Sequence, residues 1–290
     1  MGKTAIAIQL AQYFNTEIIS ADSRQCYKEL NIGVAKPTAQ ELQTVPHHFI
    51  NYLSITDEFN AADYEKYATE KINAIFKKND VAIVTGGTGL YISAFTDGLN
   101  TIPEVELTLR TQLRKTYHEQ GIDWLLSQLK MHDAAYLQGN HMNNPQRLLR
   151  ALEVKLSTGK SILSFQQKID KQHSFAIISV CLQQDRTVLI ERINSRVDQM
   201  IEDGLVAEVE ALQAYQHLNA LQTVGYKEIF NYLNRKCSLQ EAIEQIKINT
   251  RRYAKRQVTW FSKVKNMVMV PPDYHHILHY ILLQQKNTDN

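Results

Sequence analysis

The 290-residue sequence lacks the features that would place it in several special classes of protein. It contains no run of about eighteen consecutive apolar residues, which argues against a membrane-spanning helix. Its three cysteines are far apart and form no CxxC pair, which argues against a disulfide framework or a cysteine-ligated zinc site. The first residues do not follow the basic-then-apolar layout of a secretory signal. We therefore expect a cytoplasmic protein without a membrane partner.

Excess charge of one sign is scarce overall but not locally. The 32 lysines and arginines nearly balance the 30 aspartates and glutamates, so the net charge of +2 predicts no polyanionic partner by itself. Residues 245–272, however, contain no acidic side chain and carry seven basic ones: Lys247, Arg251, Arg252, Lys255, Arg256, Lys263 and Lys265. Four of them, spaced i, i+1, i+4 and i+5 from Arg251, gather on one side of a helix. This basic face predicts binding of a polyanion, either RNA or a diphosphate.

Short apolar segments rich in β-branched residues alternate with helical segments. The apolar segments, typical of buried strands in a largely parallel sheet, are 16–21, 81–85, 175–182 and 267–270, with 48–53 as a weaker candidate. Helical periodicity is present at 3–14 and 61–77, with Asn60 as a candidate cap of the second helix. Strands that alternate with helices in this way predict an α/β fold.

The pattern changes between residues 104 and 168. No strand-like run occurs there, and leucines recur at helical spacing from Leu107 to Leu113 and from Leu148 to Leu156. We therefore predict two domains. Residues 1–103 and 169–290 form a catalytic core, and residues 104–168 form a helical insertion domain.

Gly2-Lys3-Thr4 opens the first predicted helix and matches the last third of the phosphate-binding loop GxxxxGK[ST]. In such a loop, backbone N–H groups and the helix N-terminus bind phosphates, the lysine neutralises charge and the threonine binds Mg²⁺. The leading glycine, the loop body and the preceding strand are not in the sequence, and so short a match also arises by chance. We expect the incomplete loop to weaken both stability and diphosphate binding.

Asp22 directly follows the first predicted strand. Ligands of parallel α/β sheets bind beyond the carboxyl ends of the strands, so Asp22 is placed to accept a proton or to bind metal-bound water. It can equally cap a turn. The third predicted strand leads into a glycine-rich turn that suits either phosphate binding or a plain strand-to-helix connection, and its glycines are Gly86, Gly87 and Gly89.

Arg192 and Arg196 lie four residues apart and therefore on one face of a predicted helix. Two guanidinium groups on one face can bind a chain of phosphates. They can also belong to a solvated face, with Glu191 and Asp198 as local partners. Both interpretations remain open from the spacing alone.

Several segments, in order, resemble the sequence motifs of the bacterial tRNA dimethylallyltransferases. The segments that carry this resemblance are 2–4, 19–27, 31–37, 86–91, 144–147, 196–200, 224–227 and 254–260. The resemblance extends over residues 1–261, and motifs in a fixed order are far more specific than any one of them. It implies a P-loop NTPase-like parallel sheet flanked by helices, with a helical insertion domain.

The resemblance also implies an activity. The family transfers a dimethylallyl group from dimethylallyl diphosphate to N6 of adenosine 37, in tRNAs that read codons beginning with U, and releases diphosphate. The diphosphate-binding residues implied by position are Gly2, Lys3, Thr4 and Arg196, with Thr4 also binding Mg²⁺. Asp22 is implied as the general base, and Lys3 and Arg196 as catalytic residues that stabilise the leaving group.

The partner implied by the resemblance is the anticodon stem-loop of tRNA, which the insertion domain is expected to grip. The implied tRNA contacts are Asp22, Ser23, Arg24, Gln25, Thr88, Arg110, Gln146, Arg147, Leu148, Leu149 and Arg150. We expect the protein to act as a monomer.

Two alternative functions belong to other classes. One is a kinase or prenyltransferase that acts on free adenine nucleotides. The other is a non-catalytic RNA-binding relative, because the phosphate-binding loop is incomplete. The helical insertion and the acid-free stretch at 245–272 favour RNA over a free nucleotide. The presence of Asp22 and Arg196 favours catalysis over binding alone.

Overall fold

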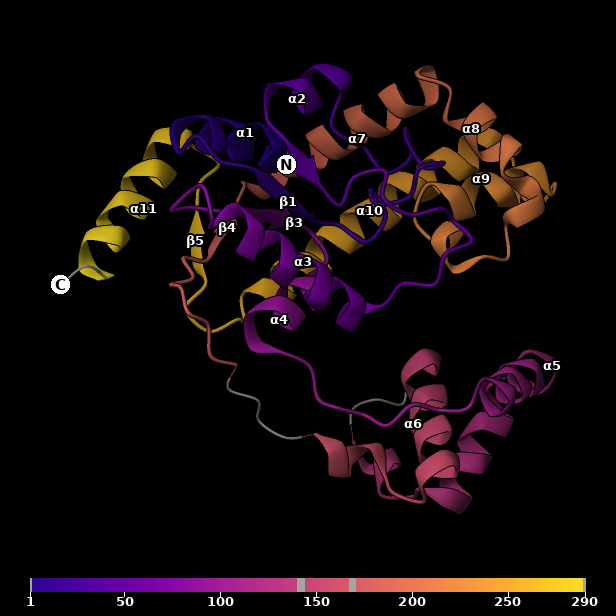
Figure 1. The fold of residues 1–290 in the computed structure, drawn as a ribbon. Helices are drawn as coiled ribbons and strands as arrows, with labels where there is room; N and C mark the ends of the chain where they lie inside the picture. The colour runs from indigo at the N-terminus through magenta and orange to yellow at the C-terminus, as the bar shows by residue number, and fades with distance from the viewer. Residues whose placement is uncertain (1, 140–143, 167–170, 289–290) are drawn as a thin grey trace. The chain divides into compact units, whose positions relative to one another are not determined.

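The computed structural model describes residues 2–139, 144–166 and 171–288 (Figure 1). The chain divides into two compact units, which we call the core unit and the insertion unit. The core unit is Met1–Thr96 together with Gln172–Asn290, and the insertion unit is Asp97–Lys171. The range 104–168 from the sequence lies within the insertion unit. No helix of the described residues is both long enough and apolar enough to cross a membrane.

The core unit contains five strands and most of the helices among the described residues. Its strands are β1 Ile18–Ala21, β2 His47–His48, β3 Ile83–Gly86, β4 Val180–Leu182 and β5 Val268–Val270. Its α-helices are α1 Lys3–Tyr13, α2 Ala39–Thr44, α3 Ala61–Ile75, α4 Gly89–Asp97, α7 Arg186–Glu202, α8 Leu205–Ala211, α9 Tyr226–Leu233, α10 Leu239–Phe261 and α11 Tyr274–Thr288. Short 3-10 turns at Gln213–Tyr215 and Asn219–Leu221 connect α8 to α9.

All strand pairings are parallel, which confirms the predicted fold class. Three strands form one sheet in the order β2-β1-β3, and β4 pairs with β5 in a second sheet. The four residues of β1 are buried, as expected for a central parallel strand covered on both faces. Helix α1 packs on both sheets, because Ile8 joins Ile18 of β1 in one cluster and Ile6 and Leu10 join Val270 of β5 in another.

Two predicted strands are much shorter than the sequence indicated, whereas β1, β3 and β5 begin only one or two residues later than predicted. β4 covers only the last three residues of 175–182, because Phe175 packs instead in an aromatic cluster, 6.3 Å from the ring of Phe95 and 5.1 Å from that of Phe76. The segment 48–53 contributes only His48 to β2. Positive φ angles at Phe49 and Asn51, 64° and 52°, interrupt the extended backbone beyond it.

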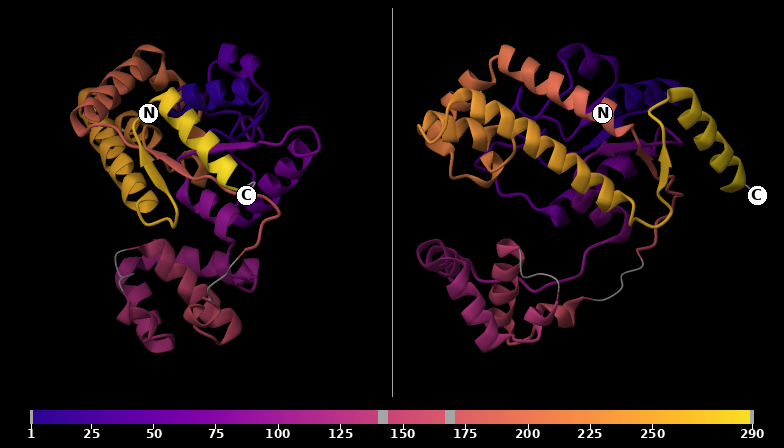
Figure 2. Two further views of the ribbon diagram at one scale, coloured as in Figure 1. Left: turned by 90° about the vertical axis from the view of Figure 1, so that its left-hand side faces the viewer. Right: turned by 180° about the vertical axis from the view of Figure 1, so that it is seen from behind.

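Helix α3 begins as its sequence predicts. Asn60 caps α3, since its Oδ1 accepts hydrogen bonds from the backbone N–H groups of Ala62 and Asp63, and the carboxylate of Asp63 accepts one from the N–H of Asn60. The buried face of α3 includes Tyr64, whose ring stacks on Tyr91 of α4 with centroids 4.3 Å apart. Helix α10 packs against both α7 and α9, as Figure 2 shows.

The insertion unit is helical throughout its described secondary structure. It contains α5 Leu107–His132, α6 Pro145–Thr158 and 3-10 turns at Tyr136–Gln138 and Ile162–Phe165. Gly121, with φ of 76°, breaks α5 into two helical segments. Helix α6 begins with Asn144 as its cap and Pro145 in the first turn. Leucines from α5 and α6 form its hydrophobic core, which is separate from the cores of the other unit.

Candidate active site

The N-terminus of α1 is the first part of the candidate site. Gly2 precedes the helix with φ of 90°, a left-handed conformation that glycine adopts with little strain. Lys3 and Thr4 follow as half-buried residues, and the first turn contains no acidic side chain. The free N–H groups of a helix start, together with the positive end of its dipole, form an anion-binding site. The local structure therefore suits a phosphate group.

Two predicted catalytic side chains, Asp22 and Arg196, act on the pKa of a third, Lys3. Burial lowers the pKa of Lys3, the carboxylate of Asp22 opposes this shift, and the guanidinium of Arg196 adds to it. Such effects on a partly buried lysine require charges at close range. The structure thus brings residues from α1, from the end of β1 and from α7 into one charged cluster, which we call the catalytic cluster.

A cavity of about 510 Å³ adjoins the catalytic cluster. The residues that line it are Gly2, Val188, Glu191, Arg192, Ser195 and Arg196. Arg192 and Arg196 of α7 therefore face the same space as Gly2, and this geometry favours the phosphate interpretation of their spacing. Lys3 and Thr4 adjoin Gly2 in the chain but do not line this cavity. Arg192 is also held by Gln184, whose Oε1 lies 3.4 Å from its Nη1.

Asp22 both caps a turn and keeps one oxygen available. Its Oδ1 accepts hydrogen bonds from the backbone N–H groups of Arg24 and Gln25, at 2.9 and 3.2 Å. Its Oδ2 has no hydrogen-bond partner among the described residues. The two interpretations of Asp22 from the sequence are therefore compatible. One oxygen fixes the carboxylate, and the other can accept a proton.

Thr88 connects the glycine-rich turn to the segment after β1. Its Oγ1 accepts a hydrogen bond from the backbone N–H of Ser23 at 2.9 Å and donates one to Ser23 Oγ at 3.2 Å. Its own N–H donates to the carbonyl oxygen of Ala21 at 3.0 Å. Thr88 and the segment 22–25, which were predicted to contact the same nucleotide, are thus brought together.

The glycines of this turn are required by close contacts. A Cβ on Gly86 would lie 2.2 Å from the carbonyl oxygen of Ala21, and one on Gly89 would lie 2.4 Å from the ring of Trp260. The side chain of Gln257 donates a hydrogen bond to the carbonyl oxygen of Gly87 at 2.8 Å. The motif at 86–91 therefore packs on the motif at 254–260 of α10. The phosphate interpretation of this turn gains no support from these contacts, which are structural.

A second set of contacts supports the segment 22–25. Gln25 Nε2 donates hydrogen bonds to the carbonyl oxygens of Val34 and Ala35. Residues 31–33, which lead into Val34, are held by Glu208 of α8. Its carboxylate accepts hydrogen bonds from their backbone N–H groups and from the hydroxyl of Tyr226. A Cβ on Gly33 would lie 2.5 Å from the ring of Tyr226. Glu208 and Tyr226 thus fix the loop on which Gln25 rests.

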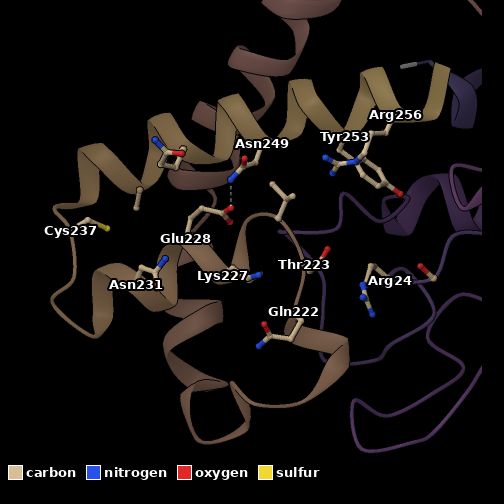
Figure 3. A pocket seen from close by; sticks show the side chains of 14 residues that line it. Arg24, Gln222, Thr223, Lys227, Glu228, Asn231, Cys237, Asn249, Tyr253 and Arg256 are labelled. Atoms are coloured by element: carbon tan, nitrogen blue, oxygen red, sulfur yellow. Dashed lines mark hydrogen bonds between the residues drawn. The ribbon is translucent and has the colours of Figure 1, made fainter. Parts of the chain in front are cut away.

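A second cavity, of about 590 Å³, lies next to Arg24 (Figure 3). Its wall is formed by segment 22–25, the connection into α9, α9 itself and α10, and it includes Lys227, Tyr253 and Arg256. The guanidinium of Arg256 lies 5.7 Å from the centre of the Tyr253 ring. Between α9 and α10, Glu228 accepts a hydrogen bond from Nδ2 of Asn249 at 2.8 Å, and both residues belong to the lining. A cavity of this size, with aromatic and cationic walls, suits a nucleotide.

The predicted tRNA contacts of the insertion unit differ in exposure. Gln146 and Arg147 are exposed at the start of α6, and Arg110 and Arg150 are partly exposed. Leu148 and Leu149 are buried in the core of the unit, so their side chains position α6 and are not presented to a ligand.

Sequence reasoning missed several residues that build the site. Glu208 lies in no recognised motif. Its role depends on a contact with a loop about 180 positions earlier in the chain, and the spacing of residues in the sequence does not reveal such a contact. Tyr226, Gln257 and Trp260 lie within recognised motifs but received no role. Each of them packs against a glycine. Tyr226 contacts Gly33, and Gln257 and Trp260 contact the glycine-rich turn.

Comparison with known proteins agrees with the motif resemblance. The family model described as IPP transferase matches residues 25–264. The tRNA dimethylallyltransferase of Christiangramia forsetii is 46% identical over 91% of this chain and 87% of its own length. The tRNA dimethylallyltransferase 1 of Bacteroides thetaiotaomicron is 41% identical over 98% of this chain and 92% of its own length.

Solved structures give the same result. The full-length tRNA isopentenylpyrophosphate transferase of Bacillus halodurans superposes with a TM-score of 0.73 at 34% identity, covering 99% of this chain and 94% of that one. A eukaryotic dimethylallyltransferase acting on tRNA superposes with a TM-score of 0.75 at 28% identity, covering 93% and 71%. The extent and identity of these matches show that the chain belongs to the IPP transferase family, which includes the tRNA dimethylallyltransferases.

Proposed function

We propose that the protein transfers the dimethylallyl group of dimethylallyl diphosphate to N6 of adenosine 37 in tRNAs that read codons beginning with U. The observation that carries this proposal is the catalytic cluster, in which Gly2, the neighbour of Lys3, lines the same cavity as Arg196, and Asp22 and Arg196 both act on the pKa of Lys3. Two cations suit a departing diphosphate, and a carboxylate suits the proton that the acceptor amine must lose. The relatives described above are the second support for this assignment.

The donor would be held by its diphosphate. The backbone of Gly2 and the side chains of Lys3 and Thr4 offer the helix N-terminus, a cation and a hydroxyl. Arg196 faces the adjoining cavity and offers a guanidinium that can bind two phosphate oxygens. These groups stabilise the negative charge that grows on the leaving group in the transition state.

Bond formation and proton transfer would occur at the acceptor amine. The lone pair of N6 forms a bond to the allylic carbon, the bond from that carbon to the diphosphate oxygen breaks, and its electron pair leaves on diphosphate. The nitrogen becomes positively charged and loses a proton to Asp22. We assign the proton to Oδ2, because Oδ1 is occupied by two backbone N–H groups. An adenine in a loop costs less to extrude than one in a duplex.

Mg²⁺ would bind together with the diphosphate. Among the described residues there is no group of three His, Cys, Asp or Glu side chains that could hold a metal ion. Mg²⁺ commonly keeps several waters and binds through one or two protein oxygens plus substrate phosphates, so a sparse set of protein ligands fits this ion. Thr4 would provide the protein oxygen. When bound, the ion neutralises charge on the leaving diphosphate.

The tRNA would contact both units. In the core unit, segment 22–25 and Thr88 would surround the target nucleotide. The cavity of Arg24, Tyr253 and Arg256 would take a neighbouring nucleotide, because it combines cations with an aromatic ring. In the insertion unit, the predicted contacts that reach the surface would bind the anticodon stem-loop, namely the exposed Gln146 and Arg147 and the partly exposed Arg110 and Arg150.

Transfer of a labelled donor tests the proposal. The protein is incubated with labelled dimethylallyl diphosphate and Mg²⁺, and in parallel with unmodified tRNA, with the same tRNA carrying guanosine at position 37, and with AMP. We expect label only in the tRNA with adenosine 37. Label in AMP alone would refute the tRNA acceptor and favour a nucleotide prenyltransferase. Tight tRNA binding without any transfer would favour an RNA-binding protein without catalysis.

A further inference from the structure

The insertion unit contains a buried carboxylate surrounded by arginines. Glu153 of α6 is only 3% exposed. Three guanidinium groups lie within ion-pair distance of it: Arg110 Nε at 3.5 Å, Arg114 Nε at 3.7 Å and Arg150 Nη1 at 3.4 Å. The first two come from α5 and the third from α6, and Figure 1 shows these helices side by side. We call these four residues the arginine cluster.

The charges of the arginine cluster do not balance. A buried carboxylate is costly unless it is paired, and a single arginine would satisfy that need. Three arginines leave an excess of two positive charges around one acid. Their side chains are not buried with it, since Arg110, Arg114 and Arg150 are 30%, 59% and 32% exposed. The cluster is therefore anchored beneath the surface and carries its excess positive charge toward solvent.

Packing of α5 on α6 does not require this arrangement. Buried leucines already join the two helices, among them Leu113, Leu125, Leu148 and Leu152. Guanidinium groups fixed by a shared carboxylate lose less side-chain entropy when they bind a second anion than free surface lysines do. Planar groups with several N–H donors match the geometry of phosphate oxygens.

We infer that Glu153 is a positioning residue that holds Arg110, Arg114 and Arg150 as one binding surface for the phosphodiester backbone of tRNA. This inference rests on the proposed function and adds to it two residues without an assigned role. Arg114 becomes a further phosphate contact. Glu153 acts through the arginines and does not itself touch RNA.

The first test compares two charge deletions on neighbouring residues of α5. Arg114→Gln removes a cation of the cluster, and Lys115→Gln removes one that is 77% exposed and paired only loosely with Glu119 at 4.0 Å. Binding of the full-length protein to tRNA is measured over a range of salt concentrations. We expect Arg114→Gln to weaken binding about three- to tenfold and to reduce the slope of log K against log salt by about 0.7 to 0.9. Lys115→Gln should leave both unchanged. Equal effects of the two substitutions would overturn the inference.

The second test uses a substitution for which long-range attraction and positioning by Glu153 predict opposite changes in tRNA affinity. Glu153→Gln keeps the size of the side chain and makes the protein more positive by one charge. If only long-range attraction mattered, tRNA would bind more tightly. If Glu153 positions the arginines, tRNA should bind about three- to tenfold more weakly, and KM for tRNA should rise by a larger factor than kcat falls. Unchanged or tighter binding by a folded Glu153→Gln protein would refute the positioning role.

Two further measurements keep these outcomes interpretable. Circular dichroism and thermal unfolding establish that each variant is folded. If Glu153→Gln does not fold, Arg114→Lys serves instead, because it keeps the charge and loses the planar fork. It should weaken tRNA binding with little change in the salt slope, and wild-type affinity would count against the inference. If the wild-type protein neither binds nor prenylates tRNA, the proposed function itself is refuted. If the wild-type protein is active and the variants behave like it, only the inference about the arginine cluster is refuted.

Discussion

Replacement of Asp22 separates its two roles, because one carboxylate oxygen supports the backbone and the other is assigned to catalysis. Asp22→Asn keeps an oxygen that accepts the hydrogen bonds from Arg24 and Gln25, but its amide cannot act as a base. General-base catalysis contributes about 10²- to 10⁴-fold in rate. We therefore expect kcat to fall by about that factor, which corresponds to about 2.7 to 5.5 kcal/mol of activation free energy. The free energy of unfolding and the affinity for tRNA should change little.

Asp22→Ala provides the matched comparison. It removes the same base and also the acceptor of two backbone hydrogen bonds, each worth about 0.5 to 1.5 kcal/mol of stability. The alanine protein should therefore be about 1 to 3 kcal/mol less stable than the asparagine protein, with a similar loss of kcat. Single-turnover transfer of labelled donor measures the rate, and urea unfolding measures the stability. An Asp22→Asn protein with the wild-type rate would refute Asp22 as the base. Equal stability of the two variants would refute the structural role of Oδ1.

Three other perturbations test the contacts around the site. Gly89→Ala should lower the free energy of unfolding by about 1 to 3 kcal/mol in urea titrations, since its Cβ would lie 2.4 Å from the ring of Trp260. In a Trp260→Ala background the same change should be neutral or stabilising. Tyr226→Phe should cost about 1.5 kcal/mol in the same assay, because Glu208 loses a hydroxyl donor, and a change below the error of the titration would contradict that contact. Diphosphate binding should weaken as the pH rises through the lowered pKa of Lys3, because burial favours the neutral form of Lys3 and the bound anion favours the charged form. Calorimetry across this pH range should show proton uptake on diphosphate binding, and Lys3→Arg should remove that uptake.

The sequence predicted those parts of the fold that depend on local pattern. Buried β-branched segments became parallel strands, and Asn60 became a helix cap, because each signal lies within a few residues of its effect. The strand predicted at 175–182 was too long. Its hydrophobic pattern fits a strand and an aromatic cluster equally well, and the partners of Phe175 lie far away in the chain. Tertiary contacts decided between them.

The candidate site was predictable to the extent that its residues adjoin strand ends and helix starts. Lys3, Asp22 and Arg196 were predicted in this way, and in the structure Asp22 and Arg196 act on the pKa of Lys3. Glu208 was not found, because a surface acid on a helix has many possible partners. Arg114 and Glu153 were missed for a related reason. The sequence gives the charge of each residue but not that three guanidinium groups share one buried carboxylate.

Several side chains assigned to tRNA already hold the protein together. Gln25 donates to two carbonyl oxygens of the loop at 31–36, and Thr88 is bonded to Ser23. A contact from RNA to these groups therefore exchanges one hydrogen bond for another, and an exchange contributes little net affinity. Much of the affinity should then come from cations with excess charge, at the cavity of Arg256 and at the arginine cluster. Gln25 and Thr88 would instead fix the shape of the pocket around one base. Substitutions at the cations should accordingly raise Kd for all tRNAs, whereas Gln25→Ala should lower the rate for the correct nucleotide more than it raises Kd.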